Sequence, residues 1–202
     1  MEIDAATLNR ATAYKLMTGA IVPRPVAWVT TQSAEGVVNA APYSAYTLIS
    51  PDPPLLVFHS SRRNGDKDSA RNIRATGEFV VNVANEDLLV QMHQCSASLP
   101  PDVSEPATFG IALSPSTTVT PPRIKASPIC FECKQVQMFD VGNEPHTVII
   151  GQIVHFYVAD RLYRDGRIDQ AQLRPVARVG GPTYARLGEL IHLPPPQGYR
   201  SD

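Results

Sequence analysis

The chain has 202 residues, with 18 lysines and arginines against 19 aspartates and glutamates, which gives a net charge of −1. A hydrophobic content of 43% supplies a core and excludes general disorder, and the balanced charge argues against a nucleic-acid surface. Its 19 prolines do not suit a helical bundle, because proline breaks helix interiors. We therefore expect one β-rich domain.

The first half of the chain predicts short strands separated by turns. A helix is expected over residues 4–17, where Asp4 can act as its cap and Gly19 can end it. Apolar segments bounded by glycine and proline then predict strands over residues 26–31, 37–43, 46–49 and 55–59. A helix over 68–75 and a strand over 78–83 follow.

The second half predicts two longer strands after a proline-rich segment. Asn85 can cap a helix that runs to about Cys95. Residues 98–128 show little periodicity, and we expect them to form a long excursion over the surface. Strands follow over 129–139 and 147–158. Many short strands with few helices indicate a closed β-barrel whose ends are covered by helices.

The N-terminal residues, the apolar runs and the cysteines favour a cytoplasmic location. Residues 1–4 carry no basic or long apolar segment, so we expect no secretion signal, and the apolar runs are too short for a membrane span. Three cysteines without a disulfide framework, Cys95, Cys130 and Cys133, suit a reducing environment. We expect a cytoplasmic protein without a membrane or nucleic-acid partner.

Cys130 and Cys133 form a C-x-x-C pattern that could bind metal or carry redox chemistry. Zinc needs a second ligand pair, and no histidines lie at ligand spacing. A redox motif should open a helix, but the surrounding residues predict a strand, on which positions three apart face opposite sides. Structural thiols are therefore favoured over a redox or metal role, and no metal site is expected.

Residues 60–74 concentrate positive charge on an otherwise neutral chain. The basic residues are Arg62, Arg63, Lys67, Arg71 and Arg74. The last three lie at helical spacing and would share one face. Two hydroxyl groups precede them where a strand turns into a helix, and free N–H groups with the helix dipole suit a phosphate there. The alternative is a solvated basic face paired with Asp66, Asp68 and Glu78.

Two other stretches could line a binding site. Residues 39–46 combine small side chains with a proline, so a flat ligand could approach the strand closely. Asn39, Ser44 and residues 30–31 could supply the polar groups of such a pocket. The alternative is an ordinary strand pair. The turn at 180–181 could return Arg178 or Tyr184 to a site or be a surface turn. Glu132 could be an exposed acid or a buried, paired structural carboxylate.

Taken in order, these stretches resemble the flavin reductase-like family with the FMN-binding split barrel, which includes flavoredoxin-type proteins. The matching pieces are residues 21–31, 39–44, 50–54, 67–73, 77–82, 151–154 and 175–181, with Gly36, Glu132, Cys133 and Tyr184. The resemblance implies a mainly β fold, a split β-barrel of Greek-key type with flanking helices. It implies a single domain over 1–202, with a core of about 15–185 and a proline-rich tail over 186–202.

The family implies FMN in a cleft at a homodimer interface, with FAD or riboflavin as exchangeable flavins and NADH or NADPH as reductant. By that resemblance the phosphate would meet Ser60, Ser61, Arg62, Lys67, Asp68 and Ser69. The ring would lie along Asn39, Ala40, Ala41, Pro42, Tyr43 and Ser44, near Thr30 and Thr31, with Arg178 and Tyr184 as further residues near the ring. Many relatives carry threonine at the position of Ser69, which keeps the hydroxyl group.

The resemblance implies an NAD(P)H:flavin oxidoreductase that passes electrons to oxygen, a partner monooxygenase or another acceptor. The cofactor carries such chemistry, which explains why no acid–base pair is readable and leaves catalytic residues unassigned. Three alternatives stay open: a flavin-binding electron carrier or sensor without a nicotinamide reaction, a pyridoxamine-phosphate-oxidase-like flavoenzyme, and a non-enzymatic scaffold.

Overall fold

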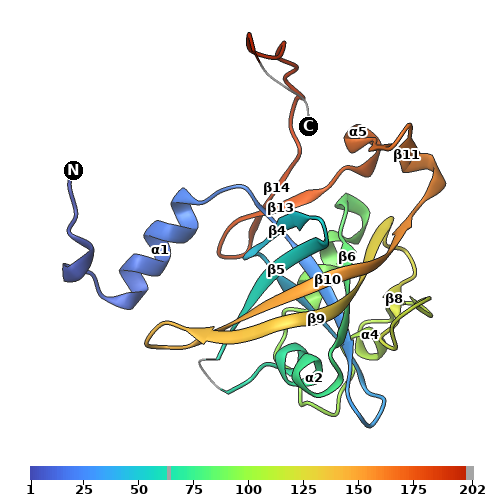
Figure 1. Ribbon diagram of the computed structural model, residues 1–202. Coiled ribbons are helices and arrows are strands. Elements are labelled where there is room, and N and C mark those ends of the chain that lie inside the picture. The colour runs from blue at the N-terminus through green and yellow to red at the C-terminus, as the bar shows by residue number, and fades with distance from the viewer. Residues whose placement is uncertain (63–64, 199–202) are drawn as a thin grey trace.

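The computed structural model describes residues 1–62 and 65–198, and its centre is a seven-stranded antiparallel sheet curled into a barrel (Figure 1). The strand order is β3-β2-β6-β9-β10-β5-β4. The strands are β2 (Ala27–Gln32), β3 (Val38–Tyr43), β4 (Tyr46–Pro51), β5 (Pro54–Ser61), β6 (Glu78–Val83), β9 (Ile129–Val141) and β10 (His146–Val158). The mainly β barrel expected from the sequence is confirmed.

Helices and short strands flank the barrel. The α-helices are α1 (Arg10–Ala20), α2 (Asp68–Thr76), α3 (Leu89–Gln94), α4 (Glu105–Thr108) and α5 (Gln170–Leu173). The 3-10 helices are η1 (Ala5–Thr7), η2 (Glu86–Leu88) and η3 (Asp160–Leu162). A three-stranded sheet joins β1 (Arg24–Pro25), β13 (Val176–Gly180) and β14 (Thr183–Arg186). Two ribbons pair β7 (Leu113–Ser114) with β8 (Arg123–Ile124), and β11 (Tyr163–Arg164) with β12 (Arg167–Ile168).

Strand β2 lies between two hydrophobic cores. Successive side chains of a strand point to opposite faces, so Trp28 packs into one core and Ala27 and Val29 pack into the other. The second core also contains Ile73 of α2 and Phe79 of β6, which are fully buried. Burying each such large side chain stabilises the fold by roughly 1.5–3 kcal/mol. Helix α2 is therefore held firmly against β2, and its first residues are fixed in space.

The barrel has a seam between β3 and β5. Within the part of the chain that the structure describes, the hydrogen-bonded ladder ends at β3 on one side and at β4 on the other. Strands β3 and β5 still contact each other, and the rings of Tyr43 and Phe58 lie 4.9 Å apart between centroids. An edge strand with unpaired backbone groups therefore faces a gap that side chains from other elements surround.

The predicted hairpins and strands are confirmed, but the first helix differs. The Asp4 carboxylate accepts a hydrogen bond from the Ala6 N–H (2.9 Å), which closes only the 3-10 turn η1. Asn9 caps α1 instead, through the Thr12 N–H (2.9 Å). Gly19 lies inside α1 and does not end it. The better placed cap, five residues further along the chain, decided where the helix begins.

The expected surface excursion over 98–128 is wrong for several of its residues. Ile111 and Ile124 are buried in the same core as Trp28, beneath α3. Asn82 accepts a hydrogen bond from the Ile124 N–H (2.8 Å), and Thr30 donates to the Pro122 carbonyl (2.7 Å). The prolines remove periodicity from this segment, but its isolated apolar side chains still complete the core.

Cys130 and Cys133 lie in different core clusters, as their strand spacing predicts. Both are free and buried, as is Cys95. Among the described residues there is no group of three or more histidine, cysteine or acidic side chains that could hold a metal ion. None of the helices in the described ranges has the length and apolar character needed to cross a membrane.

Candidate functional site

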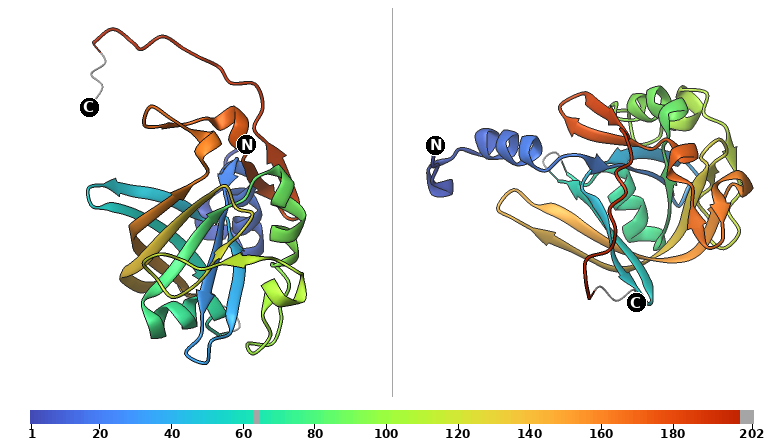
Figure 2. Two further views of the ribbon diagram at one scale, coloured as in Figure 1. Left: turned by 90° about the vertical axis from the view of Figure 1, so that its right-hand side faces the viewer. Right: turned by 90° about the horizontal axis from the view of Figure 1, so that it is seen from above.

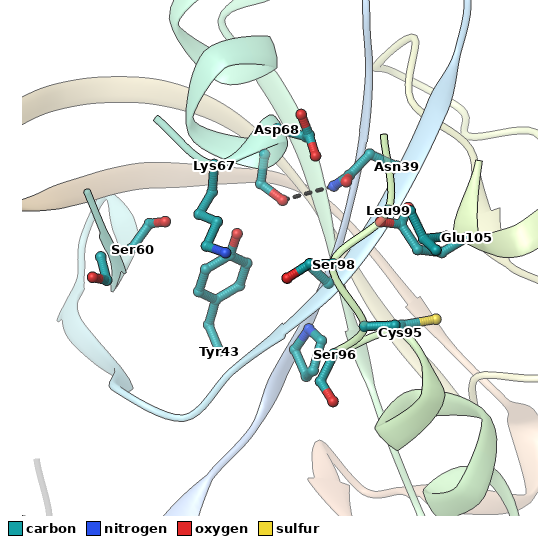
Figure 3. A pocket seen from close by; sticks show the side chains of 15 residues that line it. Asn39, Tyr43, Ser60, Lys67, Asp68, Cys95, Ser96, Ser98, Leu99 and Glu105 are labelled. Carbon is teal, nitrogen blue, oxygen red and sulfur yellow. Dashed lines mark hydrogen bonds between the residues drawn. The ribbon is translucent and has the colours of Figure 1, made fainter. Parts of the chain in front are cut away.

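A pocket of about 290 Å³ opens at the seam beside β3 (Figure 3). Its walls come from β3, β5, the start of α2, the segment that follows α3, and α4. The lining residues are Asn39, Ala41, Pro42, Tyr43, Ser60, Ser61, Lys67, Asp68, Ser69, Cys95, Ser96, Ala97, Ser98, Leu99 and Glu105. The structure therefore brings nine of the sequence-predicted site residues together in one cavity.

One end of the pocket gathers donors for an anion. Lys67 is the N-cap residue of α2, has an extended backbone, and makes no ion pair with any residue the structure describes. The first N–H groups of α2 lie beside it and carry the positive end of the helix dipole. Ser60 Oγ is buried close to the Tyr43 hydroxyl group, and it makes no hydrogen bond of normal geometry with any described residue. A buried hydroxyl group with an unmade hydrogen bond is costly unless a ligand completes it.

Most of the predicted basic cluster is neutralised by carboxylates. Arg62 forms ion pairs with Asp66 and Asp140 and does not line the pocket. Arg71 pairs with Asp68, which lies in its own helix. Arg74 lies 3.6 Å from Asp66, and Arg63 lies outside the described residues. The paired interpretation therefore holds for Arg62, Arg71 and Arg74, whereas Lys67 lines the pocket and has no ion-pair partner among the described residues.

A buried polar network holds the inner wall. The Asn39 side-chain amide donates to Ser69 Oγ (2.8 Å), which joins β3 to the start of α2. Asn72 of α2 donates to Thr31 Oγ1 on β2 (3.1 Å). Because these partners are buried, each bond fixes a rotamer on which the pocket shape depends. Thr31 therefore supports the wall from behind and does not line the cavity.

Several predicted site residues lie outside the pocket lining: Thr30, Thr31, Ala40, Ser44, Arg62, Arg178 and Tyr184. Arg178 and Tyr184 pair with each other across β13 and β14, with the guanidinium group 4.6 Å from the ring centroid. The Tyr184 hydroxyl group lies 3.1 Å from His93 Nδ1 of α3. These residues form a polar cluster on the small sheet.

Sequence reasoning missed the pocket wall formed by residues 95–99 and Glu105. Glu105 is only 4% exposed, and its Oε2 accepts a hydrogen bond from the Ala40 N–H (3.0 Å). Burial, together with the negative charge of Asp68, raises the pKa of this carboxyl group. Ser104 followed by Glu105 and Pro106 is a recognisable helix start. No signal in the sequence places that start against β3.

Glu132 is a buried structural carboxylate, one of the two alternatives left open for it. It accepts hydrogen bonds from the Thr117 N–H (2.8 Å) and from the Thr118 N–H and hydroxyl group (2.6 Å each). His155 Nδ1 lies 3.5 Å away. These contacts attach the loop after β7 to the barrel, and Glu132 does not line the pocket.

Together these features define a class of protein: a β-barrel with a seam in its hydrogen-bonded ladder, at which the start of a helix adjoins the edge of a strand. A family model described as "Flavin reductase like domain" matches residues 18–172. The chain therefore belongs to the flavin reductase-like domain family, and the resemblance seen in the sequence is confirmed.

Solved structures share both the sequence and the fold. Nitrilotriacetate monooxygenase component B from Bacillus cereus is 36% identical, with 96% of this chain and 98% of that chain covered and a TM-score of 0.93. 2-Nitrobenzoate 2-nitroreductase from Pseudomonas fluorescens is 34% identical, with 100% and 99% covered and a TM-score of 0.90. A split barrel domain protein of the flavin reductase type from Shewanella frigidimarina is 25% identical, with 96% and 98% covered and a TM-score of 0.85.

Proposed function

We propose that this protein binds FMN in the seam pocket and acts as an NAD(P)H-dependent flavin oxidoreductase. The observation that carries the proposal is the donor set at one end of the pocket: Lys67, which has no ion-pair partner among the described residues, the buried Ser60 hydroxyl group, and the start of α2. A phosphate monoester carries about −1.5 to −2 charges at neutral pH and three strong acceptor oxygens, which this donor set matches.

The remaining pocket residues suit a flat ring. Ala41 and Pro42 present little side-chain bulk along β3, so a ring system can approach the strand closely. Asn39, held by Ser69, fixes the polar end of that wall. When bound, FMN would accept a hydride from NADH or NADPH and pass electrons to an acceptor. In this proposal the chain's own residues anchor the phosphate, orient the ring and keep water from one of its faces.

Replacing Lys67 by methionine tests the phosphate anchor. A hydrogen bond to a charged group contributes about 1.5–3 kcal/mol, so we expect FMN to bind roughly 10- to 100-fold more weakly, and riboflavin, which has no phosphate, to bind as before. Titration of flavin fluorescence measures both affinities. Lys134→Met, an exposed lysine of β9, is the matched control. Equal losses for FMN and riboflavin, or no loss for FMN, would contradict the anchor.

The reaction is tested by adding NADH or NADPH to the FMN-loaded protein without oxygen. Rapid bleaching supports the reductase, and a stable yellow complex supports an electron carrier or sensor. Oxidation of pyridoxamine phosphate would instead support the oxidase-like alternative. A colourless protein that takes up no FMN would exclude all of these flavin-dependent functions. Two of the similar structures named above carry different functions in their names, so oxygen, 2-nitrobenzoate and a monooxygenase component serve as parallel acceptors.

We also propose that two chains form the working unit. Helix α1 has no buried residues, and Tyr14 and Met17 on it are 66% and 60% exposed. Figures 1 and 2 show α1 and the C-terminal tail projecting from the barrel, and Ile191 and Leu193 of the tail are 80% and 81% exposed. Apolar side chains gathered on projecting segments favour an interface. Light scattering at micromolar concentration should give the dimer mass, and a monomer mass would contradict it.

A further inference from the structure

Glu105 is a buried acid in the pocket wall. Its side chain takes part in no ion pair with any described residue. In Figure 3 it lies on the side of the pocket opposite Lys67 and Ser60. A buried carboxylate without a cation is expensive to keep ionised, because burial removes its hydration.

The edge of β3 explains why an acid is placed there. The Ala40 N–H points away from β2, since it donates to Glu105 Oε2 at 3.0 Å. Pro42 lies two residues further along, so its backbone nitrogen faces the same edge, but proline has no N–H. Glu105 therefore satisfies the backbone donor of this stretch of open edge. Both the ionised and the neutral carboxyl group can accept that hydrogen bond, so the fold does not depend on its charge.

The described lining residues carry two carboxylates, Glu105 and Asp68, and one cation, Lys67, and Asp68 also pairs with Arg71 outside the lining. Asp68, at the start of α2, is the second carboxylate in the lining, and its charge acts on Glu105. Lys67 is the one cation among the lining residues that the structure describes. The other titratable neighbours are Cys95 after α3, which is buried, and Tyr43 on β3, which is partly buried; desolvation raises the pKa of both groups and keeps them neutral near pH 7. An anionic ligand adds further negative charge to this site.

We propose that Glu105 is a proton-binding residue of the pocket, and that a phosphate-bearing ligand binds together with one proton on its carboxyl group. This coupling between ligand binding and proton binding rests on the proposed function, because FMN is the phosphate-bearing ligand considered. The proton comes from solvent and is returned when the ligand leaves. Its physical basis is a carboxylate already disfavoured by burial and by Asp68, which an incoming anion disfavours further.

Isothermal titration calorimetry of FMN binding in buffers of different ionisation enthalpy counts the protons taken up. The experiment is set at about pH 8, because the phosphate group, with its second pKa near about 6, is then fully ionised and takes up no proton itself. We expect wild type to take up a fraction of a proton, up to one, and Glu105→Gln to take up less. The glutamine amide oxygen can still accept the Ala40 N–H, so the wall is retained.

Affinity gives an independent readout. Dividing the wild-type dissociation constant for FMN by that of Glu105→Gln removes the effect of the titration of FMN itself. Because wild type must bind a proton together with FMN, this ratio should rise with pH, by at most about tenfold per pH unit. Glu144→Gln, an exposed carboxylate beside Arg10, is the matched control and should leave the wild-type profile unchanged. Zero proton uptake by wild type, or a ratio that does not change with pH, would overturn the proposal.

One neighbouring group could take up the proton instead. His59 precedes Ser60 on β5, and burial lowers the pKa of its imidazole, followed by a contribution from His146. Uptake that persists in Glu105→Gln and disappears in His59→Gln would assign the proton to His59 and overturn the role of Glu105. A wild-type protein that binds no FMN at any pH refutes the proposed function itself. If both proteins bind FMN and Glu105→Gln takes up as many protons as wild type, only this inference is refuted.

Discussion

Gly151 of β10 is the position where one added methyl group should disturb the barrel most. A Cβ atom at Gly151 would lie 2.3 Å from Phe79 Cζ and 2.8 Å from Phe79 Cε1. Carbon atoms in proteins normally approach to about 3.5–4.0 Å, so the ring would have to move by roughly 1 Å or more. Gly151→Ala therefore tests whether the core around Phe79 can yield.

The structure indicates that this core yields only at a cost. Phe79 is fully buried, and its ring contacts Phe58 edge to face at 5.5 Å between centroids. Phe58 in turn contacts Tyr43, which lines the pocket. Overpacking of this kind costs about 1–3 kcal/mol, and each kcal/mol lowers the melting temperature of a chain this size by roughly 2–4 °C. We expect Gly151→Ala to melt several degrees below wild type.

Urea unfolding followed by tryptophan fluorescence measures this effect, because the chain has one tryptophan, Trp28, and it is fully buried. Gly188→Ala is the control, since nothing lies within 4 Å of the added methyl group there. The double variant Gly151→Ala with Phe79→Leu should be less destabilised than the sum of its parts, by about 0.5–3 kcal/mol. An unchanged midpoint for Gly151→Ala, or an additive double variant, would refute the reasoning.

Two further predictions concern buried titratable groups. Burial disfavours the charge of Glu132, but hydrogen bonds, first from the Thr118 hydroxyl group, outweigh it and hold the pKa below its ordinary value. The stabilisation is therefore complete above the unfolded-state pKa and is lost as pH falls through the folded-state pKa. Glu132→Gln should lower the free energy of unfolding by about 1.5–3 kcal/mol at neutral pH, with a smaller difference near pH 4, by urea titration; a difference that grows in acid would contradict this. Burial raises the thiol pKa of Cys95 to about 12 and of Cys130 to about 11, so iodoacetamide at pH 8 should label both only after unfolding, as mass spectrometry would show. Rapid labelling of the native protein would be the opposite result.

The fold could be predicted from the sequence largely because its strands are locally encoded. The hairpin of β2 and β3 follows from two apolar runs separated by a short turn with Gly36, which adopts a φ of +89°. The start of α2 follows from the polar turn before Asp68 and its end from Gly77, in the left-handed conformation. In each case neighbouring residues supply both the pattern and the boundary.

The pocket could be predicted only in part. Asn39, Ser60 and Lys67 stand out in sequence because they lie at the start of a recognisable strand, near the end of another and directly before a helix. Glu105 lies in a segment without periodicity, and its role comes from contact with Ala40, 65 residues away in the chain. Arg62 looked like a phosphate ligand, but the folded chain pairs it with Asp140, which is 78 residues distant.

The sequence alone established the class of architecture: many prolines and short apolar runs exclude a helical bundle and favour a barrel with short connections. It also showed that a neutral chain holds a local excess of positive charge between residues 62 and 74. Only the tertiary structure decided which of those charges line the pocket. Arg62 and Arg71 pair with Asp66 and Asp68, which lie nearby in the chain and which the sequence already offered as partners. Asp140 becomes a neighbour of Arg62 only because β5, β10 and β9 pair side by side.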